Sequence, residues 1–563
     1  MNTKTRILEC VPNISEGRNP AIIQKIARVV EKVEGVRLLD IDPGVATHRT
    51  VITFVGPPEA VIEAAFHLIK EAAASIDMRQ HQGEHPRMGA TDVCPLVPVS
   101  GITLEEAAEY AHQLGKRVGE ELGIPVYMYE AAATSPDRTN LAVIRSGEYE
   151  GLEKKLLDPA WKPDYGPTRF NPGAGATVIG ARDFLIAYNV NLNTTSVRRA
   201  NAVAFDIREQ GRVQREGNTL TGKIKRDENG EPLRIPGELI GVKAIGWFIE
   251  EYGVAQVSMN ITNVKATPFH IAFEACRNSA NRRGMRVTGS ELVGLIPKKA
   301  LIDAGKYFLH QQHRSTGIPE REIIHIAVKS MGLDELTPFD PDKKIIEYLL
   351  EDKVKTPLVN LSLQGFAYKT ASESVAPGGG SVSAYAGALG AALATMVANL
   401  SAHKRGWDDR WQYFSEQAEI GQSLVDKLLF LVDEDTHAFN KIIDAVRMPK
   451  STVEEKKLRK SAMEDATKYA IHVPLEVMRT VFRSLPLVEN MIENGNPSSV
   501  SDAGVGILCL RAAAWGAWLN VKINMSGISD ETFKQDILEE GQTLIDTIDR
   551  QEQELRLKLE KLL

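Results

Sequence analysis

The chain of 563 residues is longer than one hydrophobic core can organise, so several domains are expected. A formal net charge of −7, without a strongly basic half, argues against a nucleic-acid-binding protein. The cysteines lie apart in apolar stretches and lack metal-ligand spacing, which predicts buried free thiols in a reducing cytoplasm. They are Cys10, Cys94, Cys276 and Cys509.

The sequence predicts a cytoplasmic protein without a membrane span. The N-terminal residues, Met-Asn-Thr-Lys-Thr-Arg, contain no apolar signal core and lead directly into a strand pattern. The charge-free run 381–402 is long enough to cross a membrane. Its many Ala, Gly and Ser residues, together with Asn399, favour a tightly packed helix of a soluble domain.

The first 183 residues follow the order β-α-β-β-α-β, which is typical of ferredoxin-like units. Proline begins both helices, the position that it favours. Thr103 and Glu106 predict a capping box at the start of a further helix, which ends at Leu122. Strands are expected at residues 7–11, 36–41, 49–55, 93–99 and 126–129, and helices at 20–34 and 58–76.

Residues 184–336 repeat this order without obvious sequence repetition. Thr195 is a plausible cap of the first helix of this unit, and the polar stretch 212–237 predicts a solvent-facing insertion. Two such units side by side would leave a cleft for a long ligand. Strands are expected at 184–192, 242–249, 255–261 and 287–296, and helices at 196–210 and 268–283.

A Pro- and Asp-rich linker is expected at residues 337–344. Beyond it the strand patterns stop, and long helical patterns fill residues 345–563. The predicted fold class is therefore α+β followed by all-α: two ferredoxin-like (βαββαβ) subdomains, 1–183 and 184–336, and then a helical bundle domain.

The segment 81–92 crowds histidine, glutamate, arginine and glycine between a helix pattern and a strand pattern. Histidine titrates near neutral pH, so His85 is a candidate general base. Asp42, Arg49 and Arg87 stand near strand ends, where ligands of α/β layers settle. Asp42 could orient a histidine, and either arginine could hold a carboxylate through two hydrogen bonds. Each residue alone is equally typical of a surface ion pair or a turn.

Two other interpretations of this segment remain open. His81, Glu84 and His85 fit the H-x-x-E-H spacing of inverted zinc peptidases. That motif requires a helix, and Gly83 and Pro86 disfavour a helix here. The second alternative is a polar turn that only packs.

The helical domain contains a Gly-Gly-Gly-Ser turn at 378–381 that leads into a helix. Such a turn can offer backbone donors to an anion or carbonyl, although spacing alone favours a flexible turn before a packed helix. Asp435 falls on the apolar side of its helix, where a carboxylate is costly unless it is paired or functional. Asp502 heads another helix, and an N-cap role would explain it equally well.

Longer motifs carry a resemblance to known families. Residues 7–17, the stretch His-Pro-Arg-Met-Gly-Ala at 85–90 with 92–95, and residues 184–192 resemble glutamate formimidoyltransferase. The stretch Pro-Gly-Gly-Gly-Ser-Val-Ser-Ala at 377–384 and residues 432–439 resemble formimidoyltetrahydrofolate cyclodeaminase. Their order is that of the fused bifunctional family, and the resemblance covers nearly the whole chain.

The resemblance implies two folate reactions of histidine degradation. The formimino group of N-formimino-L-glutamate moves to N5 of tetrahydrofolate, and the product then cyclises to 5,10-methenyltetrahydrofolate with release of ammonia. The family's transferase base falls on His85 and its cyclodeaminase acid/base on Asp435, with Asp42, Arg49 and Arg87 supporting the transferase site. Tetrahydrofolate is a co-substrate, expected as a polyglutamate, and no metal is implied.

The resemblance also implies binding segments and assembly. The family forms ring-shaped oligomers of dimers, and basic side chains near both sites could retain a polyglutamated intermediate. The cyclodeaminase pocket falls on Gly378, Gly379, Gly380, Ser381 and Asp502. The folate-binding segment falls on Gly166, Pro167, Thr168, Arg169, Phe170, Asn171, Pro172, Gly173, Ala174 and Gly175. Its sequence at 171–174 departs from the family pattern.

Three alternatives keep other functions open. The chain could transfer a formyl group from N-formylglutamate to tetrahydrofolate. The helical domain could be a folate-binding or assembly module without chemistry. A zinc hydrolase, the weakest alternative, would lose its activity to chelators.

Overall fold

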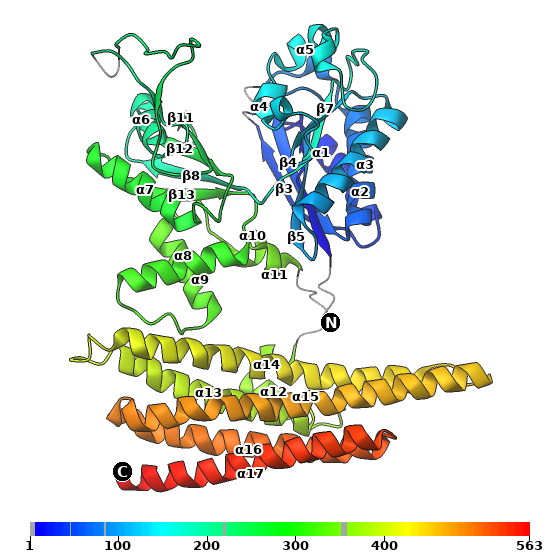
Figure 1. Cartoon of the computed structure of the whole chain (residues 1–563), viewed down its shortest axis with the longest axis vertical. Coiled ribbons are helices and arrows are strands. Elements are labelled where there is room, and N and C mark those ends of the chain that lie inside the picture. The colour runs from blue at the N-terminus through cyan, green and yellow to red at the C-terminus, as the bar shows by residue number, and fades with distance from the viewer. Residues whose placement is uncertain (1–5, 46, 84–85, 218–220, 351–356) are drawn as a thin grey trace. The chain divides into compact units, whose positions relative to one another are not determined.

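The computed structural model describes residues 6–45, 47–83, 86–217, 221–350 and 357–563. An α/β region with mixed sheets comes first in the chain and an all-helical region follows (Figure 1). The chain divides into two compact units, Met1–Asp303 with Met331–Leu350, and Ala304–Ser330 with Glu351–Leu563. The segment predicted as a linker, 337–344, contains the short helix α10 (Pro341–Lys344).

The first sheet, seven-stranded within the described residues, is built on one interrupted central strand. Both halves of this strand, β1 and β2, pair antiparallel with β4 on one side and with β5 on the other. The order across the sheet is β3 (Arg37–Gly44), β4 (Arg49–Gly56), β1 (Ile7–Cys10) with β2 (Asn13–Ile14), β5 (Thr91–Ser100), β7 (Thr177–Ala181) and β6 (Val126–Glu130).

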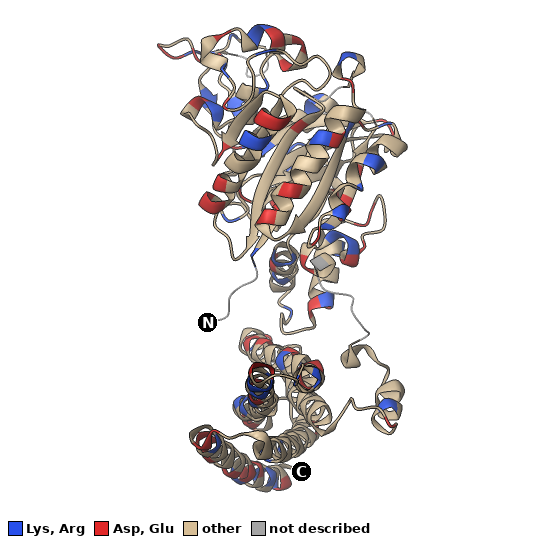
Figure 2. Ribbon diagram, turned by 90° about the vertical axis from the view of Figure 1, so that its right-hand side faces the viewer, with Lys and Arg blue, Asp and Glu red and all other residues tan. Residues whose placement is uncertain are grey.

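Helices cover one face of this sheet because their apolar stripes match its alternating apolar residues. Leu8, Ile52 and Phe54 point into this core and are fully buried. The predicted capping box of Thr103 and Glu106 is confirmed at the start of α3. Figure 2 shows that the charged residues belong mainly to the helices and loops and rarely to the strands. The covering helices are α1 (Pro20–Ala27), α2 (Pro58–Ser75) and α3 (Leu104–Leu122).

Glu9 lies on the other face of β1 and is 2% exposed. Burial raises its pKa from 4.5 to about 7, against the opposing charge of Arg182. As pH rises between these values, the unfolded chain loses its proton while the folded chain keeps it, so the free energy of unfolding falls. The fall amounts to at most about 3.5 kcal/mol, at roughly 1.4 kcal/mol per pKa unit.

We therefore expect Glu9→Gln to raise the melting temperature of this unit above about pH 7 and to change it little near about pH 4.5. Scanning calorimetry of the two proteins at several pH values measures the difference. A Glu9→Gln protein whose stability falls with pH as steeply as that of the wild type would contradict the assignment.

The second sheet, four-stranded within the described residues, is antiparallel throughout. Tyr188 of β8 packs edge-on against Phe269, with ring centroids 4.5 Å apart. Ser196, rather than the predicted Thr195, caps the first helix, because its hydroxyl accepts the N–H of Arg199. The order is β11 (Val242–Ile249), β12 (Val254–Ile261), β8 (Ile186–Leu192) and β13 (Val287–Val293), with helices α6 (Val197–Ile207) and α7 (Phe269–Arg282).

The second unit is a bundle of long helices that includes α9 (Glu320–Met331) as far as Ser330. The turn before α9 is tied to the bundle, since the Thr316 N–H donates to Ser415 Oγ (3.0 Å) and Asn399 Nδ2 donates to the Gly317 carbonyl (2.8 Å). The other helices are α12 (Leu363–Thr370), α13 (Gly379–Ala402), α14 (Trp411–Arg447), α15 (Val453–Asn494), α16 (Val500–Asn524) and α17 (Glu531–Leu562).

Two stretches of the bundle, Gly379–Ala402 and Pro497–Gly527, are long and apolar enough to cross a membrane by length and composition alone. Core helices of soluble proteins pass the same test. Much of each stretch is buried inside the bundle, in which α13 packs against α14 and α16. Length and composition therefore do not establish a membrane span here.

Candidate functional site

In the segment 81–92, the described residues 81–83 and 86–90 are irregular and lead into β5, as the sequence predicts. Its predicted base, His85, and the neighbouring Glu84 lie outside the described residues. His81 and Arg87, on either side of them, are both buried. Within the described part of the chain, no group of three or more His, Cys, Asp or Glu side chains could hold a metal ion.

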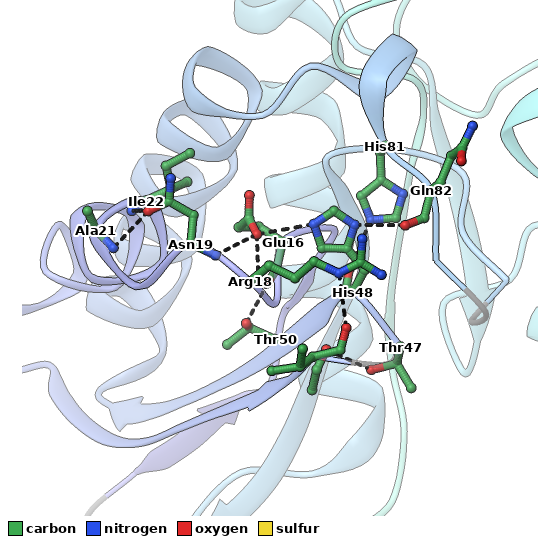
Figure 3. A network of polar contacts seen from close by, with 12 residues as sticks. Glu16, Arg18, Asn19, Ala21, Ile22, Thr47, His48, Thr50, His81 and Gln82 are labelled. Atoms are coloured by element: carbon green, nitrogen blue, oxygen red, sulfur yellow. Dashed lines mark hydrogen bonds and ion pairs between the residues drawn. The ribbon is translucent and has the colours of Figure 1, made fainter.

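Two histidine rings stack beside this loop (Figure 3). The rings of His48 and His81 lie 4.3 Å apart and are inclined by 10°. His48 Nδ1 lies 2.9 Å from the Gln82 carbonyl, and its Nε2 lies 3.2 Å from Glu16 Oε1. His81 Nε2 lies 2.8 Å from the His48 carbonyl. The sequence analysis did not predict this cluster.

Arg87 is held by two carboxylates of the chain. Its guanidinium makes two hydrogen bonds to Glu150, of 2.6 and 2.9 Å, and one of 3.2 Å to Glu148. These three residues line a hollow of about 510 Å³ together with Gln82, Gly83 and Gly147. A substrate carboxylate at Arg87 would therefore compete with two glutamates, which weakens its predicted role as a carboxylate clamp.

Asp42 and Arg49 lie on one face of the β3–β4 pair, opposite the helical core, because their ladder partners are Val51 and Gly44. Arg49 donates from Nε and Nη2 to Asn13 Oδ1, at 2.9 and 2.6 Å. Burial lowers the pKa of Arg49 to about 10, so it remains a cation at neutral pH. Burial raises the pKa of Asp42. The structure thus brings these two predicted residues to a common face.

The predicted folate-binding loop returns to the same segment. The second half of the loop, 171–175, and the residue after it form hydrogen bonds with the residues just before β5. The Ala90 N–H donates to the Ala174 carbonyl (2.8 Å), and the Ala176 N–H donates to the Met88 carbonyl (3.1 Å). Its first half, 166–169, is exposed. Gly89 is required at this contact, since a Cβ would lie 2.3 Å from the Ala176 carbonyl oxygen.

The bundle positions Asp435 against the start of α13. Ser381 Oγ donates to Asp435 Oδ2 over 2.9 Å. Burial raises the pKa of Asp435, and the hydrogen bonds from Ser381 oppose this shift. A partly buried carboxyl group with a raised pKa can hold a proton and give it up, which is the behaviour of a general acid.

The neighbours of Asp435 have other partners. Asp433 accepts the Leu358 N–H over 2.6 Å, and Glu434 accepts the Tyr469 hydroxyl. Asn520 of α16 is the side chain that faces Gly379. Asp502 heads α16 eighteen residues earlier, about 27 Å away along the helix, so a single chain does not bring it to the 378–381 turn.

Gly380 leaves the space that Asp435 occupies. A Cβ added at Gly380 would lie 2.0 Å from Asp435 Oδ1, so Gly380→Ala must displace the carboxylate. We expect the ammonia-releasing reaction predicted for this region to slow by at least about tenfold, because a displaced acid loses its alignment. A smaller loss is expected for Gly378→Ala, whose added methyl meets nothing within 4 Å. Equal losses in the two variants, measured as ammonia release, would rule out the contact as the cause.

Comparisons with known proteins cover both regions. Residues 7–182 match the formiminotransferase domain, N-terminal subdomain; residues 187–351 match the formiminotransferase domain; and residues 362–543 match the formiminotransferase-cyclodeaminase family. The formimidoyltransferase-cyclodeaminase of Mus musculus is 42% identical over 532 residues, 94% of each chain.

Two shorter relatives each match one part of the chain. The glutamate formimidoyltransferase of Streptococcus pyogenes is 43% identical over 304 residues, 54% of this chain and 93% of the relative. The methenyltetrahydrofolate cyclohydrolase of Methylorubrum extorquens is 34% identical over 186 residues, 33% of this chain and 89% of the relative. The two regions of the chain therefore also resemble separate proteins.

Proposed function

Because the chain belongs to the formimidoyltransferase-cyclodeaminase family, we propose that its two regions carry out consecutive folate reactions. Residues 7–351 transfer the formimino group of N-formimino-L-glutamate to N5 of tetrahydrofolate. Residues 362–543 cyclise 5-formimidoyltetrahydrofolate to 5,10-methenyltetrahydrofolate and release ammonia. The observation that carries the proposal is the similarity over 94% of both chains to a relative named for both activities.

In the transferase step, N5 of tetrahydrofolate attacks the formimino carbon and forms a tetrahedral adduct. His85 takes the N5 proton as the new N–C bond forms, and the bond from carbon to the glutamate nitrogen then breaks. The glutamate nitrogen leaves with a proton as free glutamate. Arg49, a partly buried cation, and Asp42 on the same sheet face support the site, and the loop 166–175 holds the folate.

In the cyclodeaminase step, N10 attacks the same carbon, its proton passes to the imino nitrogen, and the amino group formed in this way leaves as ammonia. Asp435, in its protonated form, gives the second proton to that leaving group. Two observations support this role of Asp435. Ser381 holds one of its carboxyl oxygens through a hydrogen bond, and its raised pKa favours the protonated form. The 378–381 turn lies beside it with helix-start N–H groups that suit a carbonyl of the pterin.

We also infer that each sheet of the first region is a ferredoxin-like unit, with subdomains at 1–183 and 184–336, a linker at 337–344 and a helical domain at 345–563. The strand order of the second sheet supports this, since β11-β12-β8-β13 is the order of a βαββαβ unit. The core of the first sheet has the same order, β3-β4-β1-β5, extended by β7 and β6.

The remaining parts of the proposal concern the setting of the enzyme. We expect a cytoplasmic homo-oligomer built from dimers, which acts on polyglutamated folate without a metal. The free cysteines support a reducing compartment. Large apolar side chains exposed on α13 and α16 suit contacts between copies. They are Val382, Leu389, Leu400, Val505, Leu508, Leu519 and Ile523.

The donor is tested by offering N-formimino-L-glutamate and N-formyl-L-glutamate separately with tetrahydrofolate. Only the formimino donor carries the nitrogen that leaves as ammonia. We expect folate-dependent glutamate release with the formimino donor and little with the formyl donor. Faster release from the formyl donor, without ammonia, would favour the formyltransferase alternative.

A further inference from the structure

The His48 ring faces a hydrogen-bond acceptor at each of its nitrogens. Nδ1 faces the Gln82 carbonyl and Nε2 faces the Glu16 carboxyl, at 2.9 and 3.2 Å. A ring nitrogen must carry a hydrogen to bond a carbonyl or carboxylate oxygen. Both bonds therefore exist together when His48 is an imidazolium and Glu16 is a carboxylate (Figure 3).

Glu16 is held in the ionised form. Its Oε1 accepts the backbone N–H groups of Arg18 and Asn19, at 2.8 and 3.0 Å. Burial raises the pKa of Glu16, but these bonds and the charge of His48 outweigh burial, and the net pKa is lowered. A carboxylate with these donors stabilises a positive charge on His48.

His81 is the neutral member of the stack. Its Nε2 donates to the His48 carbonyl over 2.8 Å, and its Nδ1 accepts from Arg87 Nε over 3.2 Å. The Nδ1 atom must be unprotonated to accept that bond. Burial also lowers the pKa of His81. A neutral ring stacked on a cationic one removes the repulsion that two imidazolium rings would have.

The backbone at this contact admits little substitution. His48 adopts a left-handed conformation, with φ of 49°. A Cβ at Gly83 would lie 2.6 Å from the Thr47 carbonyl oxygen and 2.8 Å from His48 Cβ. Residues 82–83 therefore contact residues 47–48 directly. Residues 82–83 come immediately before the part of the sequence that contains His85.

We propose that His48 is a positioning residue of the transferase, whose imidazolium is held by Glu16 and anchors the backbone of Gln82 at the start of the base-carrying segment. This inference rests on the proposed transferase function. Loss of the hydrogen bond from His48 to the Gln82 carbonyl removes this anchor, so we expect formimino transfer to slow.

Two substitutions of His48 separate its bonds. Asparagine places an amide nitrogen near the position of Nδ1 and tolerates left-handed backbone, so His48→Asn keeps the bond to Gln82. Glutamine places its nitrogen near Nε2 and loses that bond. We expect His48→Asn to keep kcat within about threefold, and His48→Gln to lose about tenfold in kcat with little change in KM.

The matched control is His67→Gln. His67 also pairs with a glutamate, Glu63, at 2.9 Å, but on the exposed side of α2. It should leave kcat unchanged. Equal kcat in His48→Asn and His48→Gln would overturn the proposal.

A readout without catalysis separates this inference from the proposed function. Amide hydrogen exchange in the peptide covering residues 79–92, corrected for intrinsic pH effects, should be faster in His48→Gln than in His48→Asn. Unchanged exchange would refute the anchor even in an active enzyme. Faster exchange in a protein without transferase activity would keep the anchor and refute the function.

Discussion

Asp435→Asn is expected to stop ammonia release while the transferase step continues. Asparagine keeps the size of the side chain and can still accept the hydroxyl of Ser381, which lies 2.9 Å from the carboxylate. It cannot donate a carboxyl proton to the leaving amino group. Loss of a positioned acid typically costs about 10²–10⁴-fold in rate, so the 5-formimino intermediate should accumulate. Ammonia and glutamate, measured together, report the two steps separately.

The control for this substitution is Asp444→Asn. Asp444 lies on the same helix, α14, but is exposed. It should leave both products unchanged. Undiminished ammonia release from Asp435→Asn would remove Asp435 from the reaction and favour a helical domain that acts as a binding or assembly module.

His85→Ala is expected to abolish formimino transfer with a similar loss, about 10²–10⁴-fold, because N5 loses its proton acceptor. Cyclisation of 5-formimidoyltetrahydrofolate supplied directly should continue at the wild-type rate, because Asp435 belongs to the other region of the chain. The measurement is glutamate release from the donor, followed by methenyl formation from the supplied intermediate.

A second histidine provides the comparison for His85→Ala. His67→Ala removes an exposed imidazole from α2 and should have no effect on either step. If His85→Ala retained rapid glutamate release, the general base would have to be another group.

Local patterns predicted the elements well. The strand β11 has the expected bounds, Val242–Ile249, because its apolar alternation ends at turns on both sides. The capping box at Thr103 is equally local. Helix α1 was expected to reach residue 34, but it ends at Ala27, and a short 3-10 turn at Val30–Lys32 continues the apolar pattern without a helix. An apolar spacing cannot distinguish these two continuations.

The site was less predictable because it depends on long-range register. Asp435 could be singled out from the cost of a carboxylate on an apolar helix face, and it lies half-buried against Ser381. The cluster of Glu16, His48 and His81 could not be predicted, because it requires the antiparallel pairing of β2 with β4 and the return of the chain after α2. The only hint of this cluster in the sequence is that polar residues follow β2 and precede β4.

The most direct test of the two-site account is one reaction of the purified chain with tetrahydrofolate and N-formimino-L-glutamate. Methenyltetrahydrofolate is followed by its absorbance, while glutamate and ammonia are measured in parallel. The account predicts all three products in equal amounts, with glutamate released no later than ammonia. Glutamate without ammonia or methenyl product would contradict the cyclodeaminase assignment, and the absence of all three would contradict the assignment of the substrates.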